Sequence, residues 1–120
     1  STGVTARAKL IRDDPDLVRR YLAAQVEAIA RMKRDKSYAI SVMGKYLRTT
    51  DPELLSEAYE VFAQKYLMSV PLPTVEAIQP VLEELAIRNP KAKEQDPRKF
   101  FDDSFVRQLE VSHFIENLYK

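Results

Sequence analysis

The sequence predicts an all-α fold, because apolar residues recur at three- and four-residue steps and aspartate–proline pairs mark helix starts. Only 2 of the 120 residues are glycine, so few positions suit the tight turns of β-hairpins. We expect a single helical domain or fragment over residues 1–120. An extended arm and a short helix would occupy 1–13, and an irregular antiparallel bundle of about five helices would occupy 14–120.

The composition excludes several classes of function. The 19 Lys and Arg nearly balance the 18 Asp and Glu, which argues against a dedicated polyanion binder. Two glycines leave no nucleotide-binding loop, and the lack of cysteine removes disulfides, zinc ribbons and thiol nucleophiles. The sequence has neither an apolar run of membrane-spanning length nor a signal pattern at its start.

The N-terminal residues Ser1–Thr5 are predicted to have an extended backbone, because Val4 and Thr5 are β-branched. Residues 6–12 can form a two-turn helix. It should stop before Pro15, because the residue preceding a proline is pushed out of the α region.

The next two helices are predicted over Pro15 to about Asp35 and over Ser37–Arg48. Asp14 can cap the first of them, and Pro15 suits its first position. The apolar stripe of that helix comprises Leu17, Val18, Tyr21, Leu22, Val26, Ile29 and Met32.

A further helix should start near residues 50–53 and end before Val70. Two starts are open: Asp51 as the cap with Pro52 in the first position, or Thr50 and Glu53 as a reciprocal capping box. The prolines that follow Val70 then impose an extended connection.

Thr74 caps the following helix, which should end at Asn89-Pro90. Pro80 removes one backbone hydrogen bond, which should kink the helix or delay its start, and we expect a kink. The side chains expected to face inward are Val75, Ile78, Val81, Leu82 and Leu85.

The C-terminal region begins with a polar link over 91–95 and a short turn over Pro97–Phe101. One helix should then run from Asp103 to the end of the chain. The aspartate–proline pairs at 14, 51 and 96 are spaced by 37 and 45 residues with unlike intervening patterns, so they are independent caps rather than repeats.

No group of residues suggests catalysis or a bound metal, and we expect no cofactor. The single histidine, His113, is expected to be structural. Glu83 and Glu84 are neighbours on a helix and diverge by about 100°. Asp102, Asp103 and Ser104 resemble a helix N-terminus.

Two further patterns are expected to be structural rather than functional. The basic residues Arg31, Lys33, Arg34 and Lys36 have acidic neighbours, so nucleic-acid binding is not expected. The tyrosines beside the apolar stripes are expected in the core and at its rim. They are Tyr21, Tyr38, Tyr46, Tyr59 and Tyr66.

The order of several short motifs resembles the C-terminal part of the substrate-binding proteins of ABC importers. The nearest likeness is to the branch that includes thiamine-pyrimidine, taurine and aliphatic-sulfonate binders. It covers essentially all 120 residues. The motifs that carry it are Gly3–Arg7, Asp14–Arg20, Lys45–Asp51, Pro73–Gln79, Asn89–Lys93, and Ser104–Glu110 with Phe114-Ile115.

The resemblance implies a fragment of a periplasmic or lipid-anchored α/β protein of two lobes, which binds a small organic solute and delivers it to a membrane permease. Val4–Arg7 would be the strand returning from the second lobe, and the later helices would pack on the outside of the first. Most ligand contacts would lie upstream. Within this chain Thr5 and Arg7 come nearest to candidate ligand contacts. Pro80 departs from the family pattern.

Two functions follow as hypotheses. The chain is the helical scaffold of such a solute-binding protein, or it is a free-standing helical module whose apolar grooves hold a partner helix. An enzyme is not expected, because no nucleophile, base and orienting group can be assembled. A segment that lacks its covering lobe should expose apolar surface, so self-association by exchange of helices is also expected.

Overall fold

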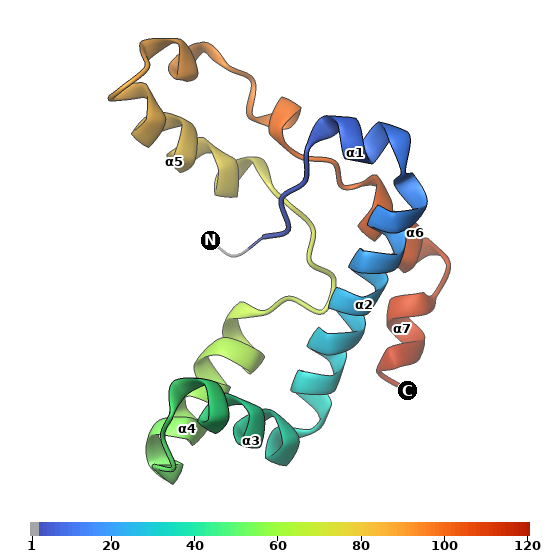
Figure 1. Cartoon of the computed structure of the whole chain (residues 1–120), viewed down its shortest axis with the longest axis vertical. Helices are drawn as coiled ribbons and strands as arrows, with labels where there is room; N and C mark the ends of the chain where they lie inside the picture. The colour runs from blue at the N-terminus through green and yellow to red at the C-terminus, as the bar shows by residue number, and fades with distance from the viewer. Residues whose placement is uncertain (1–2) are drawn as a thin grey trace.

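The computed structural model describes residues 3–120; the extended backbone expected at Ser1 and Thr2 lies outside this range. All regular elements within the described range are helical, which confirms the predicted class. There are seven α-helices, one π-helix and two 3₁₀-helices over residues 3–120 (Figure 1). Residues 3–7 precede the first helix as an irregular arm.

The first two helices follow the prediction closely. Helix α1 spans Ala8–Asp13, and α2 spans Pro15–Arg34. The Asp14 carboxylate accepts a hydrogen bond from the Leu17 N–H at 3.0 Å, which satisfies one of the unpaired donors at the helix start. Proline at the first position of α2 costs nothing, because that N–H has no partner in a helix.

Helices α3 (Lys36–Leu47) and α4 (Pro52–Tyr59) are also capped by aspartates. Asp35 accepts from the Tyr38 N–H at 3.0 Å. Asp51 accepts from the N–H groups of Glu53 and Leu54 at 3.0 and 3.2 Å, so the Asp51 cap forms rather than the reciprocal capping box.

Element η1, a π-helix over Glu60–Tyr66, continues α4 without a break. The Leu67 N–H bonds the Phe62 carbonyl five residues earlier, at 3.0 Å. The sequence predicted one ordinary helix here. The wider turn was missed because apolar spacing does not distinguish a π-helical turn from an α-helical one.

Helix α5 spans Val75–Ala86, with the Thr74 hydroxyl accepting from the Ala77 N–H at 3.2 Å. Pro80 lies inside this helix, so it does not delay the start. Of the five side chains expected to face inward, only Leu82 is buried. Ile78 is half-buried, whereas Val75, Val81 and Leu85 are exposed to solvent, and a helix pattern by itself cannot reveal this difference.

The C-terminal region contains η2 (Pro90–Glu94), η3 (Pro97–Phe100), α6 (Ser104–Val111) and α7 (Phe114–Leu118). The expected polar link is thus a 3₁₀-helix. The single last helix that we predicted is broken at His113, whose φ of 63° is left-handed. Neither glycine nor proline marks this break, so the sequence pattern did not indicate it.

Two clusters of buried side chains form the core, and α2 contributes to both. The first joins Val26 of α2 to Val106, Leu109 and Ile115 of α6 and α7. The second comprises Ala39, Tyr59 and Ala63, with Met32, Ile40 and Met43 packed against it. Helix α2 is therefore the spine of the molecule.

The overall shape is open, with two arms extending from the spine (Figure 1). Its extents are 47 × 36 × 21 Å, and its radius of gyration is 17.0 Å. A compact chain of this length has a radius of gyration of about 14 Å. The exposed area is 9352 Å², against about 6,600 Å² for a folded monomer of this mass.

One of the arms consists of α5, η2 and η3. Among the described residues, α5 packs against η2 and η3 and against no other helix. The other arm, formed by α3, α4 and η1, lies at the opposite end of the molecule (Figure 1).

We expect limited trypsin digestion to cut first at the basic residues beyond α5, because few buried contacts hold this segment. The expected sites are Arg88, Lys91, Lys93, Arg98 and Lys99. Mass spectrometry of the first fragments checks this. Earlier cuts at Arg31 or Lys33 in α2 would contradict the assignment of α2 as the spine.

Loss of the Asp51 cap should destabilise the fold measurably. We expect Asp51→Ala to lower the free energy of unfolding by about 1 kcal/mol, because two helix N–H groups lose their acceptor. Asp51→Asn keeps an acceptor and should stay close to the original stability. Urea unfolding of both variants measures the difference; equal losses would show that the cap does not contribute.

Candidate functional site

The two candidate ligand contacts, Thr5 and Arg7, lie in the exposed N-terminal arm. The Arg7 carbonyl accepts from the N–H groups of Leu10 and Ile11 at 2.9 and 3.3 Å, so this residue starts α1. Neither residue lines the hollow beside α3 and α4 or the hollow on η1, and Arg7 makes no side-chain capping hydrogen bond to α1. The described part of the chain therefore does not assemble a ligand site around them.

His113 lies at the sharp turn between α6 and α7. Its Nδ1 is 2.7 Å from Oε2 of Glu116, and its side chain is exposed. This contact, with a further hydrogen bond from Lys120, lowers the pKa of the Glu116 carboxyl. His113 therefore contributes to the local structure of α7, as expected.

Asp102 and Asp103 lie immediately before the first residue of α6. The Asp102 carboxylate accepts from the Ser104 N–H at 2.9 Å, so it caps the start of α6. Asp103 pairs with Arg107, at 2.6 Å. Over residues 3–120, no group of three or more His, Asp or Glu side chains is arranged to hold a metal ion.

The cluster of basic residues holds the corner between α2 and α3. Arg31 pairs with Asp35 at 3.0 Å, and Lys36 pairs with Glu60 at 2.8 Å. Arg34 donates to the Leu118 carbonyl at 2.6 Å, which fastens the end of α7 to α2.

Asp35 at this corner is a stabilising charge. The Tyr38 N–H, followed by the Ser37 hydroxyl, lowers the pKa of its carboxyl below the ordinary value. A carboxyl whose pKa is lower in the folded chain stabilises the fold above its unfolded pKa. That contribution is lost as pH falls through the folded pKa.

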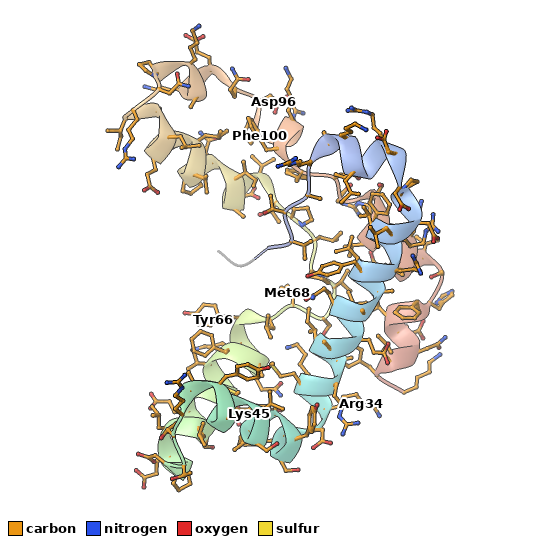
Figure 2. All side chains as sticks on the ribbon, in the orientation of Figure 1. Arg34, Lys45, Tyr66, Met68, Asp96 and Phe100 are labelled. Atoms are coloured by element: carbon orange, nitrogen blue, oxygen red, sulfur yellow. The ribbon has the colours of Figure 1, made fainter. Side chains whose placement is uncertain are left out.

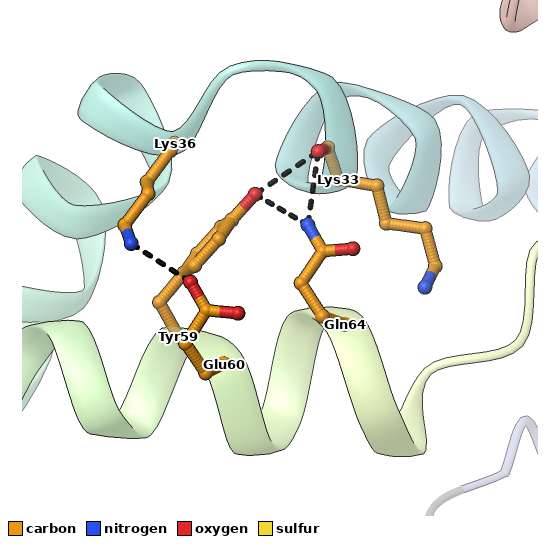
Figure 3. A network of polar contacts seen from close by, with 5 residues as sticks. All are labelled: Lys33, Lys36, Tyr59, Glu60 and Gln64. Carbon is orange, nitrogen blue, oxygen red and sulfur yellow. Dashed lines mark hydrogen bonds and ion pairs between the residues drawn. The ribbon is translucent and has the colours of Figure 1, made fainter.

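A polar network joins the corner to η1 (Figure 3). The Tyr59 hydroxyl donates to the Lys33 carbonyl at 3.0 Å. The Gln64 amide donates to the same carbonyl at 3.1 Å and to the Tyr59 oxygen at 2.6 Å. The Lys33 ammonium in turn donates to the Ala63 carbonyl at 2.7 Å. The bonds to Lys33 join residues 26 to 31 positions apart in sequence, so no local pattern could have predicted them.

A shallow groove of about 460 Å³ lies between α3 and α4. Its lining includes Ile40, Gly44 and Leu55, together with the basic residues Lys45 and Arg48. A Cβ at Gly44 would lie 3.0 Å from the Thr49 carbonyl oxygen, so glycine lets the end of α3 approach the following loop. No local sequence pattern indicates this groove.

The largest departure from an ordinary monomer is the amount of exposed apolar surface. Tyr59 is the single buried tyrosine among those expected in the core and rim; the other four are half exposed or more. Tyr66 and Met68, which are 70% and 65% exposed, lie on the side of their arm that faces α5 (Figure 2). Where such side chains form a contiguous patch, the patch commonly marks an interaction site in soluble proteins.

Removal of the Tyr59 hydroxyl should destabilise the chain. We expect Tyr59→Phe to cost about 1 kcal/mol, because the Lys33 carbonyl and the Gln64 amide each lose a partner. Tyr46→Phe is the matched control, because Tyr46 is 78% exposed, and it should leave the stability unchanged. Thermal unfolding of both variants provides the measurement; equal effects would contradict the role of the network.

Comparison with family models, curated proteins and solved structures finds no match to this chain. Within residues 3–120, no helix is both long enough and apolar enough to cross a membrane. What bears on function is therefore the order of the sequence motifs and the open helical architecture with its exposed apolar faces.

Proposed function

We propose that this chain is the helical part of a solute-binding protein of an ABC importer. The complete protein acts in the periplasm or another extracytoplasmic space. It captures a small organic solute between two lobes and delivers it to a membrane permease. In this proposal the 120-residue segment is scaffold, and the lobes to which it is joined supply most of the solute contacts.

The observation that carries the proposal is the large solvent-accessible area of the chain. The chain exposes about 2,700 Å² more than a compact monomer of its mass. The excess includes aromatic and aliphatic side chains on both arms, such as Tyr66 and Leu85. A helical layer that belongs to a larger protein would bury such faces, and the resemblance of the ordered motifs to solute-binding proteins of ABC importers supports this parent.

The alternative is a free-standing module that binds a partner helix. The observation that favours it is the α5 arm, whose outer apolar residues have no partner within residues 3–120. Both functions need the apolar faces to be covered. They differ in whether the cover is covalently part of the same protein.

The intact mass of the native gene product separates the two functions. An antibody raised against this segment should detect, in cell extract, a product far heavier than 13.8 kDa. A product of 13.8 kDa would contradict the solute-binding proposal and favour the interaction module.

The purified native product should also bind a solute. We expect a pyrimidine precursor of thiamine, taurine or an alkanesulfonate to raise its melting temperature. A solute present at 100 times its Kd adds about 2.7 kcal/mol, which is several degrees for a protein domain. The 120-residue chain is the control and should show no shift. No shift of the full product with any of the three classes would contradict the proposal.

A further inference from the structure

On helix α5, some apolar side chains are buried and others are exposed to solvent. Leu82 is buried against the 3₁₀ segments that follow, with 4% of its surface exposed. Val81 and Leu85 are 46% and 52% exposed. They are four residues apart and so lie on the same side of the helix. The uncovered half of α5 is therefore a short apolar stripe.

The charges on α5 are of one sign. The helix carries Glu76, Glu83 and Glu84 and no basic residue. None of the three carboxylates pairs with a cation anywhere in residues 3–120. A partner for this stripe should accordingly combine an apolar floor with positive charge.

The groove between α3 and α4 has these properties. Its lining includes Ile40 and Leu55, and the two charged residues that line it, Lys45 and Arg48, are both basic. The acidic residues of α4, Glu53 and Glu57, are not among the lining residues. Neither Lys45 nor Arg48 pairs with a carboxylate in the described part of the chain. Helices α3 and α5 both have 12 residues, so they match in length.

The two surfaces do not meet within one molecule. Helix α5 contacts neither α3 nor α4, and the arms that carry them lie at opposite ends of the spine (Figure 1). We propose that the α5 stripe of one copy of this chain docks into the α3–α4 groove of a second copy, and that the second copy returns the same contact. The result is a closed two-fold dimer. This inference does not rest on the proposed function.

The excess solvent-accessible area of the whole chain is larger than the area that such a dimer buries. A stable interface removes about 800 Å² from each partner. The chain exposes about 2,700 Å² beyond the expectation for a compact monomer, so one such interface uses less than half of the excess. Apolar contact at Val81 and Leu85 would supply the affinity, and the opposite charges would set the orientation.

Light scattering coupled to gel filtration tests the dimer on the 120-residue chain at tens of micromolar. The expected mass is twice 13.8 kDa. Leu85→Asp should return the chain to 13.8 kDa with unchanged far-UV circular dichroism. Val111→Asp is the matched control, because Val111 is 78% exposed on α6, outside both surfaces, and it should remain dimeric.

Charge reversal tests the pairing of the two surfaces. Glu84→Lys and Lys45→Glu should each weaken the dimer about tenfold, and their combination should restore most of the affinity. A monomeric original chain, a mass above that of a dimer, or a dimer that persists in Leu85→Asp would overturn the proposal. Failure of the double reversal to restore affinity would also contradict the pairing. The intact mass of the native product is measured separately, so failure of one proposal does not imply failure of the other.

Discussion

The structure depends on the burial of α2 by two sets of helices. Val26 and Ala30 are 1% and 3% exposed, and they lie four residues apart near the middle of a 20-residue helix. Helix α2 packs on α6 and α7 through the cluster around Val26, and it packs on α3 and η1 near Met32. Removal of α2 would leave two small clusters, neither of which contains enough apolar surface to fold alone.

The open shape follows from the same arrangement. Because both clusters attach to one rod, neither covers the other, and their outer faces remain in solvent. The polar network around Tyr59 and the Arg34 contacts with the chain end fix each cluster to the rod, but they do not bring the arms together. The molecule thus has ordered local packing and a large uncovered surface. That combination is expected of a structural layer whose cover is supplied by another part of a protein or by another molecule.

Much of the helical layout could be predicted from the sequence, because local chemistry determines it. Asp14, Asp51 and Thr74 cap helices where their side chains can reach free N–H groups, and the proline that follows each aspartate fits the first turn. The π-helical turn in η1 and the left-handed His113 were missed, because each depends on backbone geometry that no single residue type signals. The exposure of Val81 and Leu85 was also missed. A helical stripe indicates which residues share a face, but it does not indicate whether anything covers that face.

The most direct test of the spine is native-state hydrogen exchange of the backbone amides. The amides from Val26 to Ala30 should exchange only through global unfolding, because opening α2 disrupts both clusters at once. The amides of α6 and of η1 should exchange at the same rate or faster. Exchange of the central α2 amides through a local opening, while α6 or η1 stays protected, would contradict the account.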